Sequence, residues 1–269
     1  MWDNGISEEW IPQQRISKAL CLLRHREIFF THIWMDKQSF VVLGKLTAHC
    51  VNMRVSSHIM TDQNNIPDSV EIIDQHLDNF FDSEEILVLH EKESEIVHSD
   101  IFIVKPAEDR NFNLLLTCGL SALPMKVPDD LDHLKFAEIT ILLPTHWKLE
   151  YDDFADENNY WPIRTLKQLS KYPHLNNTWF GYGHTIPLDD THKVNHNFDS
   201  IILLGSITLS DDFTYIETEE KEIYFYSAIP IYKEELEYKL EHGTDKLLSL
   251  FEQFDIDEIV DINRKNVCK

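Results

Sequence analysis

The sequence predicts an α+β fold: a mixed, largely antiparallel sheet covered by helices, with an additional helix and strand segment at the N-terminus. Two observations predict it. Short β-branched and leucine-rich runs, each ended by Pro, Gly or Asp, are mixed with amphipathic helical patterns, and the two kinds do not alternate strictly. Hydrophobic residues make up 43% of the 269 residues, which is enough to form the core of such a sheet.

The N-terminal segment differs in charge from the rest of the chain. Residues 1–66 carry seven Lys and Arg against six Asp and Glu, whereas residues 67–269 carry 17 against 41, a net charge of −24. The change falls at the turn-rich stretch 61–68, so we predict a boundary there between an N-terminal extension of unknown role (1–66) and a main domain (67–269). Within the extension, residue spacing predicts a helix over 13–27 and strands in IFFTHIWM and SFVVLGKL.

The main domain opens with a predicted helix over 69–81, with Ser69 as its N-cap. Its apolar face is predicted to carry Val70, Ile73, Leu77 and Phe80. Strands are predicted at 100–106, 111–120, 136–144, 200–209 and 222–232.

Two further helical regions are predicted. The first covers 161–173, with Pro162 in its first turn and Pro173 at its end. The second covers 233–254 and is divided by Gly243, after which Thr244 caps another helix.

The sequence lacks the short motifs of common enzymes. It contains no phosphate-binding glycine loop, no H-E-x-x-H and no G-x-S-x-G. In the stretch WFGYGHTIP, His184 could act as a general base oriented by Asp189 or Asp190. The glycines on either side of Tyr182 have a simpler explanation, because a tight turn requires glycine wherever φ is positive. We therefore predict no catalytic residue and no enzymatic activity.

No pattern predicts a metal ion or another cofactor. The four cysteines lie far apart in the sequence, and His192 and His196 are four residues apart but lie in a turn-prone segment. The acidic clusters do not match a calcium-binding loop. The chain shows neither a long apolar run nor a signal peptide at its start, so we expect a cytoplasmic protein that does not enter membranes.

The acidity of the main domain predicts the kind of partner. A strongly negative field repels nucleic acid and anionic membranes and attracts cationic proteins. The acidic clusters could therefore form a surface complementary to a basic protein, or they could be solvated loops that only confer solubility. The oligomeric state is left open by the sequence.

Six blocks, in this order, resemble the bacterial branch of the Suppressor of fused domain family: VHSDIFIVKP, LLTCGLSALPM, AEITILLPTHW, YWPIRTLKQLSKYPH, NTWFGYGHTIP and EEKEIYFYSAIPIYKEELEYKLEHGTDKLL. The resemblance covers about residues 70–269. It implies an α+β fold and a function in binding, and it makes GYGHTIP a signature loop of the domain.

Members of this family from animals hold a transcription-factor peptide between this domain and a second one. The present sequence stops after the first domain, so we expect that two-domain clamp to be missing. The acidic residue that animal domains carry before the signature histidine is here Gly183, which argues against recognition of the same peptide. Bacterial relatives are similar to immunity proteins, which neutralise toxins.

The resemblance implies a non-enzymatic immunity protein (antitoxin) that binds a cognate toxin, for which we expect a basic nuclease. The alternative is a peptide-binding adaptor that grips a segment near Tyr172 and His184. Tyr151, Phe154 and Tyr182 are the predicted aromatic anchors. The predicted partner-binding residues are Tyr151, Asp152, Asp153, Phe154, Asp156, Glu157, Tyr172, Tyr182, His184, Asp189, Asp190, Asp211, Asp212, Glu217, Glu219 and Glu220.

Overall fold

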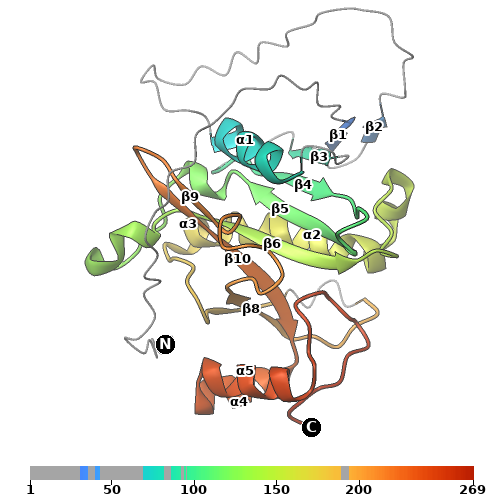
Figure 1. The fold of residues 1–269 in the computed structure, drawn as a ribbon, viewed down its shortest axis with the longest axis vertical. Coiled ribbons are helices and arrows are strands. Elements are labelled where there is room, and N and C mark those ends of the chain that lie inside the picture. Colours follow the sequence, from blue (N-terminus) through green and yellow to red (C-terminus); the bar gives the residue numbers. More distant parts are fainter. Residues whose placement is uncertain are drawn as a thin grey trace, which may run out of the picture.

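The computed structural model describes residues 31–35, 40–42, 69–81, 86–91, 94, 96–188 and 194–269. Within these ranges the chain forms one ten-stranded sheet with helices on both faces and a pair of helices at one end (Figure 1). The predicted α+β class, with a mixed and largely antiparallel sheet, is confirmed.

The strands are β1 (Thr31–Met35), β2 (Phe40–Val42), β3 (Ile86–Glu91), β4 (Asp100–Val104), β5 (Phe112–Cys118), β6 (Ala137–Pro144), β7 (Thr185–Pro187), β8 (Ser200–Leu204), β9 (Tyr215–Glu217) and β10 (Glu222–Ile231). The α-helices are α1 (Ser69–Phe81), α2 (Glu157–Leu169), α3 (Tyr172–Asn176), α4 (Lys233–His242) and α5 (Thr244–Gln253), and the 3-10 helices are η1 (Leu120–Ala122), η2 (Asp129–Leu134) and η3 (Tyr151–Ala155). Among these helices, none has both the length and the apolar character needed to cross a membrane.

The strand order is β2-β1-β3-β4-β5-β6-β10-β8-β7, and β9 pairs with β10. All neighbours are antiparallel except β1 with β3 and β6 with β10, which are parallel. The β6–β10 pairing places Tyr224 opposite Ala137. It therefore brings the segment before β6 beside the start of β10, although the two are far apart in the sequence.

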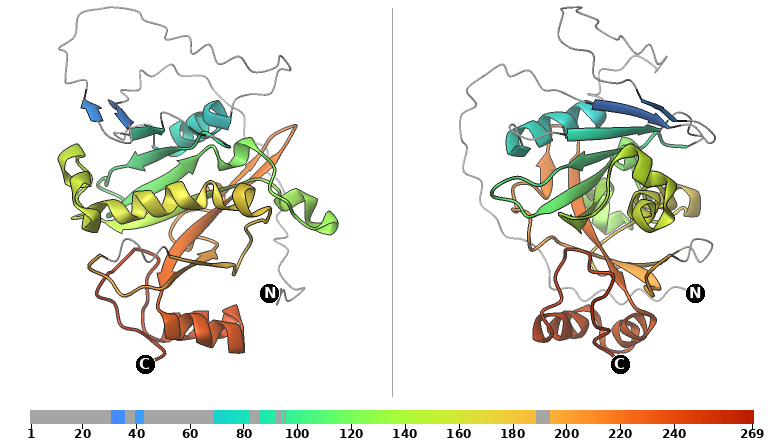
Figure 2. Two further views of the ribbon diagram at one scale, coloured as in Figure 1. Left: turned by 180° about the vertical axis from the view of Figure 1, so that it is seen from behind. Right: turned by 90° about the vertical axis from the view of Figure 1, so that its right-hand side faces the viewer.

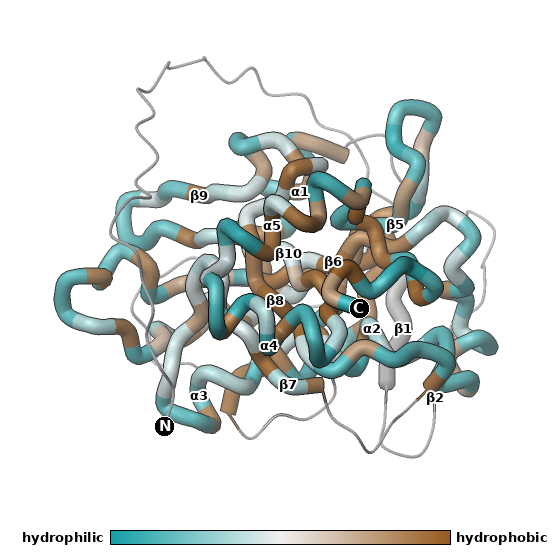
Figure 3. Tube along the Cα trace, turned by 90° about the horizontal axis from the view of Figure 1, so that it is seen from below, coloured by the Kyte–Doolittle hydropathy of each residue, from teal (hydrophilic) through white to brown (hydrophobic). Residues whose placement is uncertain are grey.

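Both faces of the central strands are covered, so these strands are buried along their whole length. In β5, Leu115 packs in the cluster beneath α2, whereas Leu114 and Leu116 pack in the cluster beneath α1 (Figure 2). This alternation is the period-2 pattern of a strand. Figure 3 shows hydrophobic residues along β6, β8 and β10 and hydrophilic residues in the surrounding loops.

A third apolar cluster joins α5 to the far end of the sheet. Leu247 and Phe251 are buried against Ile202 of β8 and Ile229 and Ile231 of β10. The α4–α5 pair is thereby packed below the end of the two strands (Figure 1). The break between its helices lies at Gly243, as predicted, and Gly243 has a φ of 89°. Thr244 is not the predicted N-cap, because it is the first residue of α5 and its side chain caps nothing.

Helix α1 has the predicted bounds, but its buried face differs from the predicted one. Ile73, Leu77 and Phe81 follow one another at intervals of four and are buried, whereas Phe80 is 38% exposed. Val70 is only partly buried. The i, i+4 spacing places Phe81 on the same side as Leu77, and Phe80 lies next to it at the edge.

Helix α2 begins four residues earlier than predicted, at Glu157, because Asp156 caps it. The Asp156 carboxylate accepts a hydrogen bond from the backbone N–H of Asn158 at 2.9 Å. Pro162 therefore lies inside the helix and not in its first turn. The predicted end is also wrong, because α2 stops at Leu169 and Pro173 lies in the first turn of the separate helix α3.

The strands β4, β5, β6 and β10 fall within the predicted runs, whereas β8 ends at Leu204, well before the predicted 209. The strands β3, β7 and β9 were not predicted. At the N-terminus, β1 and β2 lie in the two predicted strand runs, and β1 pairs with β3. The predicted helix over 13–27 lies outside the described residues, and the boundary at residue 66 stays a prediction.

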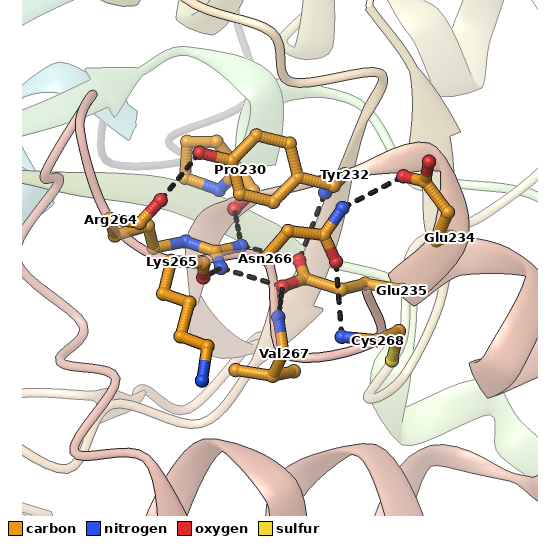
Figure 4. Close-up of polar contacts among 9 residues, drawn as sticks. All are labelled: Pro230, Tyr232, Glu234, Glu235, Arg264, Lys265, Asn266, Val267 and Cys268. Atoms are coloured by element: carbon orange, nitrogen blue, oxygen red, sulfur yellow. Dashed lines mark hydrogen bonds and ion pairs between the residues drawn. The ribbon is translucent and has the colours of Figure 1, made fainter.

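An ion pair in the C-terminal segment holds that segment against α4 (Figure 4). The Arg264 guanidinium contacts both oxygens of the Glu235 carboxylate, at 2.7 and 2.5 Å, and donates to the Pro230 carbonyl at 2.9 Å. Glu235 is fully buried and also accepts from the backbone N–H groups of Tyr232 and Val267. This many donors compensate the free energy that the carboxylate loses when it is removed from water.

A second buried carboxylate fixes the turn after β5. Glu138 accepts hydrogen bonds from the Thr117 hydroxyl, the Gly119 N–H and both the N–H and the hydroxyl of Ser121. Burial raises the pKa of Glu138 above its ordinary value, although these hydrogen bonds oppose the change. Gly119 has a φ of 134°, and a Cβ there would lie 2.0 Å from the His98 carbonyl oxygen, so the turn requires glycine.

A third buried carboxylate, Asp100, joins β3 and β4. It accepts hydrogen bonds from His90 at 2.8 Å, from His98 at 3.0 Å and from the Glu91 N–H at 2.9 Å. Burial alone would raise the pKa of Asp100, but the three donors hold it well below its ordinary value. The hydrogen bond to Asp100 also raises the pKa of His98.

Replacing Arg264 with alanine leaves Glu235 buried without its cation. We expect the free energy of unfolding to fall by about 3–5 kcal/mol, measured by urea denaturation. The control is Lys246→Ala, an exposed lysine of α5, which we expect to change the free energy of unfolding by less than about 0.5 kcal/mol. The double variant Glu235→Met/Arg264→Met should regain most of the loss, and a double variant as unstable as Arg264→Ala would contradict this account.

Asp74 in α1 should make the fold sensitive to pH. Burial, followed by the charges of Asp78 and Glu71, raises the pKa of Asp74 to about 6. Ionisation of Asp74 therefore costs stability as the pH rises through this value, since the unfolded carboxyl ionises near 3.8. We expect Asp74→Asn to raise the melting temperature at pH 7.5 and to leave it nearly unchanged at pH 4. The same gain in Glu252→Gln, an exposed residue of α5, would attribute the effect to net charge alone.

Candidate functional site

The β9–β10 hairpin and helix η2 enclose a hollow of about 290 Å³ at one end of the sheet. Helix η2 precedes β6, so the parallel pairing of β6 with β10 places it beside the hairpin (Figure 1). The hollow is lined by Asp132, His133, Lys135, Phe136, Glu217, Thr218, Glu219, Glu220, Lys221 and Glu222. Three of these residues, Glu217, Glu219 and Glu220, are predicted partner-binding residues.

The hollow is acidic, because its five carboxylates outnumber its two lysines and both lysines are engaged. The Lys135 ammonium lies 2.7 Å from the Asp132 carboxylate. The Lys221 ammonium donates to the Ser69 hydroxyl at 2.8 Å and to the Ser121 carbonyl at 3.1 Å, which ties the hairpin to α1 and η1. The carboxylates of the hairpin turn are exposed, so a cation from another molecule can reach them.

The outer face of the hairpin carries two tyrosines and two glutamates. Tyr215 lies opposite Tyr224, with ring centroids 5.1 Å apart, and Glu217 lies opposite Glu222. Burial, followed by the charges of the two glutamates, raises the pKa of Tyr215 to about 12. Like charges directly opposite each other destabilise a strand pair. The hairpin thus retains a repulsion that a bound cation would reduce.

The predicted acidic segment 150–157 lies at the other end of the sheet from the hairpin (Figures 1 and 2). The structure therefore does not bring this segment together with residues 217–222. The two groups form separate surfaces.

Several predicted contact residues in this segment have structural contacts. The Asp153 carboxylate accepts from the Glu150 N–H at 3.1 Å, Asp156 caps α2, and Glu157 forms an ion pair with Arg164. Phe154 packs in the core beneath α2 and is only 5% exposed, so it does not present the anchor predicted for it. The other two predicted residues, Tyr151 and Asp152, are half-buried and exposed, respectively.

Two further acidic pairs were predicted as contacts. Asp211 and Asp212 are exposed in the connection between β8 and β9, next to Phe213, which is buried beneath α1. Asp189 and Asp190 lie outside the described residues.

The signature loop GYGHTIP, residues 181–187, joins the sheet to α5. The Gly183 N–H donates to the Leu203 carbonyl at 2.7 Å, and the Leu203 N–H donates to the His184 carbonyl at 2.9 Å. Gly183 has a φ of 76°, and a Cβ there would lie 2.7 Å from the hydroxyl oxygen of Thr244. Glycine is therefore required by the backbone and by the close approach of α5, which is the steric explanation of this motif.

The aromatic residues of this region pack against one another. His184 contacts the Trp179 ring and carbonyl, with Nδ1 3.3 Å from the carbonyl oxygen. Burial lowers the pKa of His184, although that carbonyl opposes the change. Tyr172 stacks on the buried Phe180, with their ring centroids 5.9 Å apart. Tyr182 is 38% exposed.

In the part of the chain that the structure describes, no three His, Cys, Asp or Glu side chains are grouped so that they could hold a metal ion. His192 belongs to the segment 189–193, which lies outside that part, so the pair His192 and His196 is not tested.

The sequence matches the family described as Suppressor of fused protein (SUFU) over residues 96–265, more than half of its length. The chain belongs to the Suppressor of fused family. An uncharacterized protein of Ureaplasma parvum serovar 3 is 25% identical over 180 residues, which cover 64% of this chain and 81% of the relative.

Two solved structures show the same fold. A SUFU homologue from Neisseria gonorrhoeae FA 1090 has a TM-score of 0.57 at 18% identity and covers 74% of this chain and 96% of its own. A chain in the crystal structure of the Sufu–Fu complex has a TM-score of 0.53 at 15% identity and covers 75% of this chain and 93% of its own.

Sequence reasoning missed the contribution of η2 to this Suppressor of fused domain. Helix η2 carries Asp129, Asp130 and Asp132. Of these, Asp132 lines the hollow, as do the adjoining Lys135 and the hairpin residue Glu222. The acidic run PDDLDH was visible in the sequence. Its position beside the hairpin could not be read from the sequence, because that position depends on the pairing of β6 with β10.

Replacing Gly183 with alanine tests the steric role of the signature loop. The positive φ and the contact with Thr244 should together lower the free energy of unfolding by about 1–3 kcal/mol. Gly205→Ala is the control, because a Cβ at Gly205 meets nothing within 4 Å. We expect Gly205→Ala to lower the free energy of unfolding by less than about 0.5 kcal/mol. Both variants are measured by urea denaturation. Equal losses in the two variants would contradict the steric explanation.

Proposed function

We propose that this chain is a protein-binding domain whose acidic hairpin end receives a basic protein partner. The observation that carries the proposal is the hollow between the hairpin and η2, where five carboxylates face two engaged lysines. Charge of one sign on such a surface speeds encounter and selects partners more than it adds affinity. A chain of similar fold occurs in the Sufu–Fu complex, which agrees with binding as the mode of action.

The partner that we propose is a cognate bacterial toxin with nuclease activity, which the chain neutralises in the cytoplasm as an immunity protein. A nuclease site is basic because it must hold phosphates. A domain with a net charge of −24 over residues 67–269 is complementary to such a site. Electrostatically steered association is also fast, as neutralising a lethal enzyme requires.

We further propose that the chain acts by binding alone and that the hairpin end is the contact surface. The alternative, a peptide gripped near Tyr172 and His184, is less favoured. There the two rings already pack against Phe180 and Trp179, so a peptide would have to displace these contacts or bind beside them.

The test compares two triple variants with equal changes of charge. Glu217→Lys/Glu219→Lys/Glu220→Lys reverses the hairpin, and Glu237→Lys/Glu241→Lys/Glu252→Lys reverses exposed positions on α4 and α5. The partner is the inactivated product of the neighbouring upstream gene, and association is followed by surface plasmon resonance. We expect the hairpin variant to lower the association rate at least about 10-fold at low salt and the control much less.

A parallel assay asks whether the wild-type chain stops the active toxin from degrading DNA or RNA. Absence of both a complex and protection would overturn the immunity role. Equal decreases of the association rate in the two variants would show that the overall charge sets this rate and that the hairpin is not the contact surface. Binding that survives high salt and is lost on substitution of Tyr172 would instead support the peptide adaptor.

A further inference from the structure

Ile207 is the most exposed large hydrophobic side chain in the described part of the chain, with 83% of its surface accessible. It lies in the connection between β8 and β9, two residues before the buried Leu209. The next most exposed are Leu240 and Leu175, at 65% and 63%. A single exposed apolar side chain needs no explanation by itself. What distinguishes Ile207 is how its backbone is held.

A buried carboxylate holds this loop in place. One oxygen of Glu258, Oε2, accepts hydrogen bonds from the Ser206 hydroxyl at 2.9 Å, the Ile207 N–H at 2.9 Å and the Thr208 N–H at 3.1 Å. The Ser206 hydroxyl oxygen also accepts from the Leu209 N–H at 2.9 Å. Glu258 is 3% exposed, and its second oxygen finds no donor within the described residues. All the hydrogen bonds of this carboxylate therefore go to one loop.

This arrangement costs stability twice. Burial of a carboxylate with one oxygen unpaired is unfavourable, and exposure of the Ile207 side chain forgoes the free energy that its burial would provide. A polar residue at position 207 would be solvated at least as well, so solvation of the loop does not explain the isoleucine. Local choices that work against stability are expected where a protein functions. A fixed backbone also reduces the entropy that a loop loses on binding.

The charges around Ile207 indicate what would bind it. Asp211 and Asp212 are exposed in the same connection, and Asp257 is exposed beside Glu258. The connection continues directly into β9 and the acidic hairpin. An apolar side chain within an acidic surface is complementary to an apolar pocket with a basic rim, the arrangement in which binding hot spots occur.

We propose that Ile207 is the apolar anchor of the acidic surface, that it inserts into an apolar pocket on a basic protein, and that Glu258 is the residue that positions it. This inference rests on the proposed basic partner and adds the side chain that supplies affinity. The hairpin carboxylates speed the encounter, and Ile207 slows dissociation.

The first experiment places a photo-crosslinking residue, p-benzoylphenylalanine, at position 207 of the full chain in its native host. The same residue at position 240 serves as the control, since Leu240 has similar exposure. We expect one discrete adduct at 207 and none at 240. Mass spectrometry should identify a basic protein, and Asp211→Lys/Asp212→Lys should abolish the adduct.

The second experiment measures the affinity of the purified chain for that crosslinked protein. We expect Ile207→Ala to weaken binding at least about 10-fold, mainly through the dissociation rate, and Leu240→Ala to change it less than about twofold. Glu258→Gln should weaken binding in the wild-type background but add little when Ile207 is already alanine. A purely structural role of Glu258 would lower affinity equally in both backgrounds.

The outcomes separate this inference from the proposed function. In a third variant, p-benzoylphenylalanine is placed at position 219 of the hairpin. An adduct at 219 but none at 207, or equal affinities for Ile207→Ala and Leu240→Ala, would overturn the anchor and leave the acidic surface standing. An adduct at 207 with an acidic protein, or one unaffected by charge reversal, would overturn both. A basic partner that is not a toxin would support the anchor and overturn the immunity role.

Discussion

The structure depends on how an acidic chain buries carboxylates. Removal of a carboxylate from water costs several kcal/mol unless hydrogen bonds or a cation compensate it. In this protein Asp100, Glu138, Glu235 and Glu258 are almost fully buried, and each draws at least one donor from a loop or a terminal segment. The same groups that would destabilise an unsatisfied core therefore fix the connections around it. The apolar sheet sets the architecture, and the buried carboxylates set where its loops lie.

The acidic surface arises from topology as much as from composition. Parallel pairing of β6 with β10 carries two acidic segments, one before β6 and one at the start of β10, to the same end of the sheet. Lys135 pairs with Asp132 and the Lys221 ammonium contacts Ser69 and Ser121, so the four glutamates of the hairpin still outnumber the lysines that border the hollow. In the binding mode that we propose, charge and rigidity have separate tasks: the hairpin would attract the partner, and the β8–β9 connection would present a fixed apolar side chain.

Much of the fold follows from local patterns, and most of the site does not. Helix α1 and the strands β4, β5, β6 and β10 were predictable because their apolar periodicity is strong and their ends carry Gly, Pro or Asp. The start of α2 was missed because Asp156 outweighs Pro162 as a start signal. The separation of segment 150–157 from the hairpin, and the approach of η2 to it, depend on pairings between distant residues that no local pattern contains. Burial of Phe154 has the same origin.

The Arg264–Glu235 pair also has a consequence for synthesis on the ribosome. Glu235 leaves the exit tunnel before Arg264 has followed it, so during that interval the carboxylate has no cation and must stay in water. Helix α4 therefore cannot take its final place against the sheet until almost the whole described chain is free. Leu236 of α4 packs against the apolar cluster of β8, β10 and α5, so this cluster stays partly uncovered until then, which makes this nascent end a natural site for chaperone contact.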